Sequence, residues 1–337
     1  MTTQSTSEAI LEFQGLAKSF VTPIGVIGHI ANLFGARVKK TEIKAVAGVD
    51  LQVRRGEVVG IVGESGCGKS TVARMLAGIA SLSAGEISYQ GVRVPDMTRE
   101  QRRAFDLGVQ MIFQDPFASL NPRMRVVDII GEPAVVHGIV KSSEKRDYVT
   151  GLMEKVGLSG AYADRYPHQF SGGQRQRIGI ARALAVKPSV LICDEAVAAL
   201  DVSIQAQVLN LFMDLREEFD LTYLFISHNL GVVEHISDRV VIMYLGKAVE
   251  VASTEDLFDN PNHPYTRLLL EQLPLLEARE RDYQPIVGEL PSPLKPPSGC
   301  PFHPRCPHVM DRCKSHMPQL LPVGPGRVSA CHLNTPA

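Results

Sequence analysis

Short apolar runs recur along the chain, and longer amphipathic stretches separate them. Four such runs, each bounded by turn residues, cover Val58–Val62, Val190–Cys193, Tyr223–Ile226 and Val240–Met243. Runs that are apolar throughout, rather than at alternate positions, are typical of strands buried on both faces of a parallel sheet. Their alternation with helix-length stretches predicts an α/β fold.

The amphipathic stretches predict helices. The clearest one covers Ile204–Phe219, where apolar residues return every three or four positions and Asp201 or Ser203 is available as a cap. From Asp115 to Phe170 mostly helical segments, such as Arg146–Val156, interrupt the strand pattern. This interruption predicts a helical subdomain inserted into the α/β core.

The composition changes beyond about Thr254. Prolines become frequent, the strand pattern ends, and four of the six cysteines occur there. We therefore predict two parts, an α/β domain over residues 1–255 and a small, loop-rich, cysteine-containing module over residues 256–337.

Charge and hydropathy narrow the setting in which the protein works. The 337 residues include 35 Lys and Arg against 36 Asp and Glu, a balance that favours no nucleic-acid groove. Residues 1–10 lack the features of a secretion signal, and no apolar run approaches the roughly 18 residues of a membrane span. We expect a cytosolic protein whose membrane role comes through partners. The apolar segment Ile24–Phe34 is interpreted as a surface or interface segment.

A phosphate-binding motif follows the first apolar run. The segment Gly63–Ser70 has the pattern G-x-x-x-x-G-K-[ST], and a predicted helix, Ser70–Ala77, comes next. Loop N–H groups and the helix N-terminus attract polyphosphate, Lys69 reaches the β- and γ-phosphates, and the Ser70 hydroxyl binds Mg²⁺. By itself the motif indicates only a P-loop nucleotide enzyme. The predicted ATP-binding residues of this loop are Gly63, Glu64, Ser65, Gly66, Cys67, Gly68, Lys69, Ser70 and Thr71.

A second motif identifies the class. The segment Phe170–Arg177 and the helical stretch after it resemble the signature motif of ATP-binding-cassette (ABC) ATPases, which P-loop kinases lack. Ser171 can cap the helix that the motif opens. The resemblance implies that this helix N-terminus contacts ATP held by the opposite subunit. The residues implied are Ser171, Gly172, Gly173 and Gln174.

The segment Val190–Glu195 resembles a Walker B strand of the same family. Four apolar residues place the strand in the sheet, and the carboxylates follow at its C-terminal end, where ligands bind in such sheets. The resemblance implies that Asp194 holds Mg²⁺ together with Ser70 and Gln114. It also implies that Glu195 orients and polarises the attacking water.

Three single residues complete the site by resemblance. Gln114, at the end of the strand-like run Val109–Phe113, corresponds to the Q-loop glutamine, which senses Mg²⁺ and the γ-phosphate. His228, directly after Tyr223–Ser227, corresponds to the switch histidine that contacts the γ-phosphate. Phe20 corresponds to the aromatic residue that stacks on adenine. Glu195 and His228 are thus the expected catalytic residues.

The chain departs from the family pattern at three positions. Ala196 replaces the usual proline after the catalytic glutamate, Ala199 replaces a serine, and Asn229 replaces an aspartate. Because the carboxylate and the histidine are retained, we still expect ATP hydrolysis.

Three further stretches resemble the ATPases of dipeptide and oligopeptide importers. They are Gln114–Arg123, Asn262–Thr266 and Gly288–Leu294. The resemblance implies the ATP-hydrolysing motor subunit of a peptide importer at the cytoplasmic face of the plasma membrane. Its implied partners are a second, distinct ABC ATPase subunit, two membrane permease subunits and an extracytoplasmic peptide-binding protein. Nickel, glutathione or opine uptake is the alternative, and a soluble ABC ATPase of nucleic-acid metabolism fits less well.

The cysteines of the tail have the pattern C-x5-C-x6-C-x17-C. They are Cys300, Cys306, Cys313 and Cys331. Zinc ribbons use paired C-x2-C knuckles, which this pattern lacks, so four irregularly spaced thiolates favour a [4Fe–4S] cluster. Related importer subunits also carry a cluster here. A zinc site and an unmetallated tail stay open as alternatives, with His303, His308 and His332 as nearby rival ligands. We expect the tail to lie far from the P-loop, so that Cys306→Ser leaves ATP binding intact.

Overall fold

The structure is a computed structural model that describes residues 9–22, 41–273 and 288–335. The apolar segment 24–34 lies outside the described residues. A sheet of eight strands forms the centre, and the four predicted apolar runs are its strands β3, β7, β8 and β9. In sheet order the strands are β11 (Leu321–Gly324), β12 (Arg327–Ser329), β10 (Lys247–Ser253), β9 (Arg239–Tyr244), β3 (Val58–Val62), β8 (Thr222–Ser227), β7 (Val190–Asp194) and β6 (Val109–Ile112).

The five strands from β9 to β6 are parallel, and every residue of β3, β7 and β8 is buried. This confirms the prediction of a buried parallel sheet. Since the strands run in the same direction, the loops after β3, β6, β7 and β8 leave the sheet at one edge. The P-loop, Gln114, the Walker B carboxylates and His228 all come from these loops.

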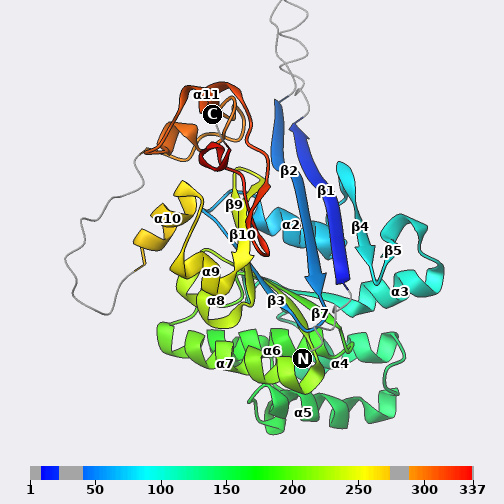
Figure 1. Ribbon diagram of the computed structural model, residues 1–337. Helices are drawn as coiled ribbons and strands as arrows, with labels where there is room; N and C mark the ends of the chain where they lie inside the picture. Colours follow the sequence, from blue (N-terminus) through cyan, green and yellow to red (C-terminus); the bar gives the residue numbers. More distant parts are fainter. Residues whose placement is uncertain (1–8, 23–40, 274–287, 336–337) are drawn as a thin grey trace, which may run out of the picture.

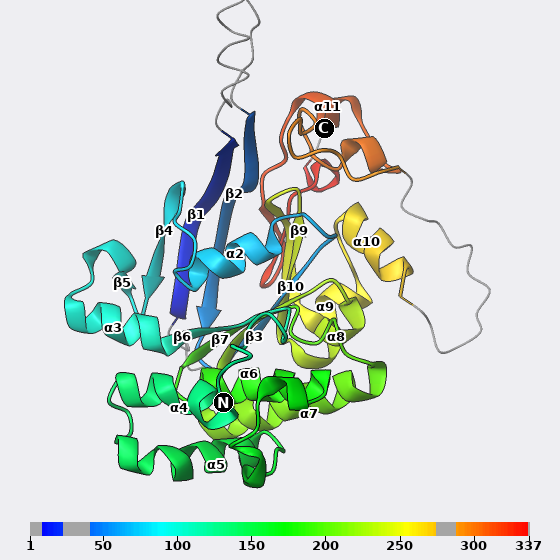
Figure 2. The same cartoon turned by 180° about the vertical axis from the view of Figure 1, so that it is seen from behind.

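A second, antiparallel sheet covers helix α2 (Lys69–Leu76). Its strands, in order, are β2 (Thr41–Arg54), β1 (Ala9–Thr22), β4 (Ala84–Tyr89) and β5 (Val92–Arg93). Apolar residues of β1, β2, α2 and β3 share one buried core, so α2 is packed between the two sheets (Figures 1 and 2). The apolar runs of the sequence did not predict this sheet.

Helices α4 to α7 pack together on one side of the main sheet, where their apolar faces form the largest core (Figure 1). The predicted helix at 204–219 is confirmed, beginning two residues earlier as α7. No helix within the described ranges is long and apolar enough to cross a membrane. The other helices are α3 (Arg99–Gly108), α4 (Val126–Val136), α5 (Lys145–Lys155), α6 (Gly172–Leu184), α7 (Val202–Phe219), α8 (Leu230–Ile236), α9 (Thr254–Asp259), α10 (Pro264–Glu271) and α11 (Asp311–Ser315).

The tail contributes strands, so the prediction that they end near residue 254 was wrong. The hairpin β11–β12 extends the main sheet, because β12 pairs with β10 through Val328 and Ser329. Its strands are short and include Pro322 and Gly324, residues that weaken any sequence signal for a strand. Phe302 and the thiols Cys300 and Cys313 pack in one core with residues of β9 and α10.

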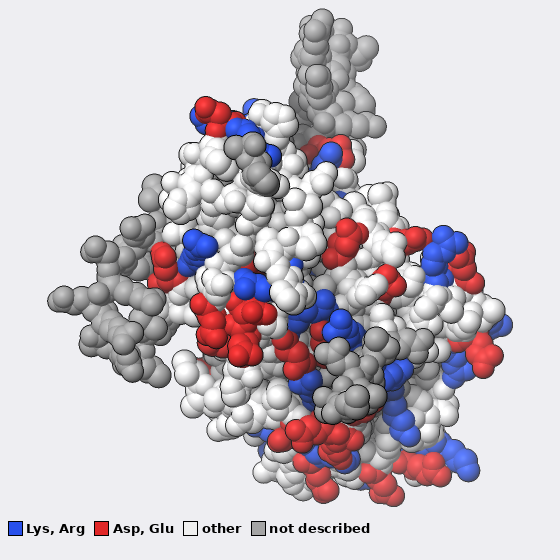
Figure 3. All heavy atoms as spheres, viewed as in Figure 1, with Lys and Arg blue, Asp and Glu red and all other residues white. Residues whose placement is uncertain are grey.

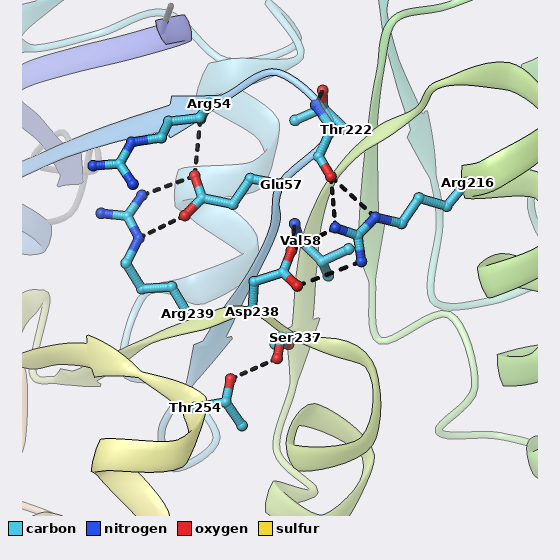
Figure 4. A network of polar contacts seen from close by, with 10 residues as sticks. Arg54, Glu57, Val58, Arg216, Thr222, Ser237, Asp238, Arg239 and Thr254 are labelled. Carbon is cyan, nitrogen blue, oxygen red and sulfur yellow. Dashed lines mark hydrogen bonds and ion pairs between the residues drawn. The ribbon is translucent and has the colours of Figure 1, made fainter. Parts of the chain in front are cut away.

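Charged side chains join the opposite edge of the main sheet, where the strands begin (Figure 4). The Asp238 carboxylate accepts hydrogen bonds from Val58 N, at 2.8 Å, and from Arg216 Nη2, at 2.7 Å. Arg239 pairs with Glu57, with 2.8 Å between Nε and Oε1. These contacts tie β3, β9 and α7 together and leave the other edge for the functional site.

Candidate functional site

The P-loop joins the end of β3 to the start of α2. Gly66 and Gly68 have positive φ values of 82° and 109°, which side chains rarely adopt. A Cβ at Gly68 would lie 2.2 Å from the carbonyl oxygen of Ala45, so no side chain fits there. No side chain caps α2, which leaves its first N–H groups for an anion.

Lys69 is buried and turned back onto the loop. Its Nζ donates to the carbonyl oxygens of Gly63, at 2.6 Å, and Glu64, at 3.1 Å. The Cys67 thiol lies 3.9 Å from the same nitrogen, and burial raises its pKa. The ammonium group is therefore held at the loop and would exchange carbonyl oxygens for phosphate oxygens when a nucleotide binds.

Two of the three residues predicted to bind Mg²⁺, Ser70 and Asp194, are in direct contact, and the third, Gln114, donates to Glu195 instead. The Ser70 Oγ donates to Asp194 Oδ1 at 2.9 Å across the start of α2 and the end of β7. Burial raises the pKa of Asp194, and the hydrogen bond from Ser70 opposes this shift. A hydroxyl and a carboxylate oxygen side by side are ligands that Mg²⁺ prefers, so these residues fit the ion.

The side chains of Gln114 and His228 both lie against the carboxylate of Glu195. Glu195 Oε2 accepts from Gln114 Nε2 at 2.6 Å, and Glu195 Oε1 lies 3.3 Å from His228 Nδ1. The Glu195 backbone has a φ of 49°, uncommon for a residue with a side chain, and its N–H donates to Ile226 O at 2.9 Å. The strand end therefore presents the carboxylate between β6 and β8, where it can orient a water molecule.

Asn229, at the position where the family pattern has aspartate, caps the helix that follows. Its Oδ1 accepts from the N–H groups of Gly231, at 3.0 Å, and Val232, at 3.4 Å, and thereby caps α8. Asparagine caps helices as well as aspartate does, so the turn after His228 is preserved. Ala196, the departure beside Glu195, is buried.

The signature residues lie at the start of α6. Ser171 Oγ accepts from Gln174 N at 3.4 Å, and Gln174 Oε1 accepts from Ser171 N at 3.0 Å, which confirms the predicted cap. Nothing lies within 4 Å of a Cβ built on Gly172, whereas a Cβ on Gly173 would lie 2.6 Å from Ile204, so the space at this helix end is on the side of Gly172 and the exposed Ser171. Among the described residues, no hydrogen bond joins 171–174 to the P-loop of the same chain.

Phe20 lies on β1 with 47% of its surface exposed. The Lys18 Nζ is 5.4 Å from the centroid of its ring. An exposed aromatic face on this strand is available for stacking.

The four tail cysteines line one small cavity. Cys300 N donates to Cys313 O at 2.8 Å, which joins two of the loops. Burial raises the pKa of Cys300 to about 11 and also raises the pKa values of Cys306 and Cys331. As they are placed, no three or more His, Cys, Asp or Glu side chains within the described ranges have an arrangement that holds a metal ion.

The tail reaches the P-loop, so the expectation that the two lie far apart was wrong. Glu64 forms a bidentate ion pair with Arg305, with distances of 2.7 Å and 2.9 Å, although 241 positions separate them. The Glu64 N–H donates to Tyr265 Oη at 3.0 Å. Sequence reasoning missed this connection because no local pattern relates residues so far apart; Tyr265 lies in the Asn262–Thr266 stretch.

Together, the P-loop, the Walker B carboxylates and the capped signature helix on a parallel sheet define a P-loop ATPase of the ABC class. Comparison with known families agrees, because residues 46–198 match the ABC transporter family. Residues 249–313 match the family described as oligopeptide/dipeptide transporter, C-terminal region. The chain belongs to the ATP-binding proteins of oligopeptide and dipeptide ABC transporters, and it is an ABC ATPase.

Full-length relatives support this assignment. The oligopeptide transport ATP-binding protein AppF of Bacillus subtilis is 48% identical, and the alignment covers 98% of this chain and 99% of AppF. The dipeptide transport ATP-binding protein DppF of Haemophilus influenzae is 47% identical, with coverage of 88% and 91%.

Solved structures share the fold. The dimeric, post-hydrolysis structure of the ATP-binding cassette MJ0796 with ADP and Pi aligns with a TM-score of 0.61 at 23% identity, covering 72% of this chain and 98% of MJ0796. The cbiO1 protein of Clostridium perfringens aligns with a TM-score of 0.61 at 25% identity, covering 75% and 92%.

Proposed function

We propose that this protein hydrolyses ATP to drive the uptake of dipeptides or oligopeptides through partner membrane subunits. The observation that carries the proposal is the full-length similarity to oligopeptide and dipeptide transport ATP-binding proteins, which includes the transporter-type C-terminal region. The same region favours peptides over nickel, glutathione or opines. Figure 3 shows Lys and Arg interspersed with Asp and Glu on one face, and the net charge is −1, so neither favours a nucleic-acid partner.

The residues of this chain divide the work of hydrolysis. Lys69 and the N–H groups of the P-loop bind and position the phosphates, and Ser70 and Asp194 would hold Mg²⁺. The Glu195 carboxylate, kept in place by Gln114, accepts a hydrogen bond from the attacking water and orients it in line with the γ-phosphate. His228 is close enough to this carboxylate to contact the same phosphate. Positioning and electrostatics thus supply most of the catalysis.

We propose that each ATP is sandwiched between the P-loop of one cassette and the signature of another. The start of α6 supports this arrangement, because Ser171 is exposed, Gly172 has free space beside it, and no hydrogen bond joins this helix end to its own P-loop among the described residues. The ATP-binding cassette MJ0796 was solved as a dimer. The partner of this chain is a related but distinct ATPase subunit. Binding of ATP closes the pair, and hydrolysis reopens it.

The helical subdomain, about residues 115–170, transmits this motion to two permease subunits at the cytoplasmic face of the membrane. Exposed apolar side chains at and beside it support a docking surface: Phe117 is 60% exposed and Val136 is 70% exposed. An extracytoplasmic binding protein delivers the peptide. Phe20, which is exposed on β1, stacks on adenine.

The experiment reconstitutes the chain with its membrane subunits, partner ATPase and binding protein in vesicles and measures phosphate release. We expect low activity from the isolated chain, because the partner's signature is missing, and a several-fold rise when a peptide is added to the assembly. Nickel, glutathione and opines serve as matched alternatives to the peptides. A response to one of these and to no peptide would contradict the proposed substrate class.

We further propose that the module over residues 256–337 binds a [4Fe–4S] cluster through Cys300, Cys306, Cys313 and Cys331. Four thiols around one cavity form a donor set suited to such a cluster. Burial raises the pKa values of Cys300, Cys306 and Cys331, and thiols bind a metal as thiolates, so binding of the cluster would release protons. The cluster would supply folding energy to a region with little apolar surface. The iron and zinc contents of the purified chain separate this proposal from a zinc site.

A further inference from the structure

Arg305 is a buried cation of the tail that contacts the nucleotide-binding loop. Its Nη1 and Nη2 donate to the two carboxylate oxygens of Glu64, at 2.7 Å and 2.9 Å. Only 6% of the Arg305 side chain and 24% of the Glu64 side chain are exposed. Bidentate pairing fixes both the distance and the angle between two groups, so this contact holds the loop in one orientation.

Aromatic side chains hold the guanidinium group in place. Its carbon lies 5.9 Å from the centroid of the Tyr244 ring, and Nη1 donates to Tyr244 Oη at 3.4 Å. The ring of Tyr244 packs edge-on against Tyr265 and Phe302, with centroids 4.8 Å and 5.3 Å away. Arg305 Nε is buried and has no hydrogen-bond partner among the residues that the structure describes. A buried ion pair in which one nitrogen lacks a hydrogen bond contributes little to the stability of a fold. We therefore infer that this pair fixes the position of the loop.

The contact continues from Glu64 to the lysine that binds phosphate. The Glu64 carbonyl oxygen accepts from Lys69 Nζ at 3.1 Å, and the Glu64 N–H donates to Tyr265 Oη. Arg305 of the tail therefore holds the side chain of Glu64, and Tyr265 of α10 holds its N–H group. The carbonyl group of Glu64 in turn holds Lys69. A shift of Arg305 would move the carbonyl oxygen that positions the ammonium group.

We propose that Arg305 is a positioning residue for the P-loop, through which the order of the tail sets the affinity for ATP. Within the described part of the chain, the polar contacts of Arg305 are to Glu64 and Tyr244 and not to Glu195, so we expect it to act on the binding of the nucleotide rather than on the chemical step. Arg305 directly precedes Cys306 and ends the short 3-10 turn His303–Arg305. Any event that reorders the cysteine loops would therefore reach the P-loop through the Arg305–Glu64 ion pair.

The test compares ATP binding by the full chain and ATP hydrolysis by the assembled transporter in matched variants. Arg305→Met keeps an unbranched side chain and removes the guanidinium group that pairs with Glu64. Arg312→Met, at an exposed arginine of the same tail, is the matched control. We expect Arg305→Met to raise the Kd and KM for ATP about three- to tenfold, with kcat changed less than about twofold. Arg312→Met leaves all three constants unchanged. Arg305→Lys, which keeps the charge, restores part of the affinity.

A second pair of variants guards against misfolding of the tail. Glu64→Gln leaves the tail sequence intact, and we expect it to weaken ATP binding to a similar degree. The double variant Glu64→Gln, Arg305→Met is then no weaker than either single variant, because both remove the same contact. Unchanged affinity in Arg305→Met, additive losses in the double variant, or an equal loss in Arg312→Met would each overturn the proposal.

Discussion

At the scale of residues, three side chains from the ends of different strands meet at the candidate site. The Glu195 backbone, with its positive φ, directs the carboxylate toward Gln114 and His228. The N–H of Glu195 is bound to Ile226 of the neighbouring strand, which holds this unusual conformation.

The first prediction separates binding from chemistry at two residues. Glu195→Gln keeps the shape of the side chain but loses the charge that polarises water, so kcat should fall by about two orders of magnitude while ATP still binds. Lys69→Ala removes a charge-assisted contact with phosphate, so the Kd for ATP should rise about tenfold or more. Equilibrium ATP binding and phosphate release on both variants check this. Near-normal turnover in Glu195→Gln would show that Glu195 does not polarise the attacking water.

At the scale of elements, the charged network of Figure 4 holds the strand starts in register. Arg216 reaches from α7 to Gly56 O, at 2.7 Å, and to Asp238 Oδ2, at 2.7 Å. Since these contacts lie at the edge opposite the P-loop, they affect the stability of the sheet and not the chemistry of the site.

The second prediction follows from this separation. Arg216→Met removes the arginine donors to the Gly56 carbonyl oxygen and one of the donors to the Asp238 carboxylate, so the free energy of unfolding should fall by about 1–3 kcal/mol. Arg55→Met, an exposed arginine in the same turn, should change it by less than about 0.5 kcal/mol. Unfolding in denaturant measures both free energies. Under conditions where the variants are fully folded, their affinity for ATP should match that of the wild type. If Arg55→Met lowered the free energy of unfolding more than Arg216→Met does, the contacts of Arg216 would not be what stabilises the sheet.

At the scale of the whole molecule, the tail and the ATPase core are continuous. The hairpin β11–β12 extends the main sheet, and Arg305 and Tyr265 both contact Glu64. The state of the cysteine loops and the state of the P-loop are therefore physically linked.

The third prediction tests that link together with the proposed cluster. Anaerobically purified chain should be brown and contain about four irons. Cys306→Ser should lose the iron and, because Arg305 is its neighbour, also weaken ATP binding severalfold. Cys193→Ser, at a buried position in β7 away from the tail, should retain the iron. One zinc and no iron per chain would assign the site to zinc. Loss of iron in Cys306→Ser with unchanged ATP affinity would contradict the proposed link between the tail and the P-loop.

Local patterns determined much of this protein. Continuous apolar runs predicted the central strands, because a strand buried on both faces admits few polar residues. The P-loop was predicted from its spacing, and the Walker B and signature residues were predicted from their resemblance to ABC ATPases, because each of these motifs consists of residues close together in the chain. Tertiary structure alone decided three features: the sheet that covers α2, the tail strands in the main sheet, and the Arg305–Glu64 pair. Each depends on contacts between distant segments, where packing and pairing partners, rather than local periodicity, select the conformation.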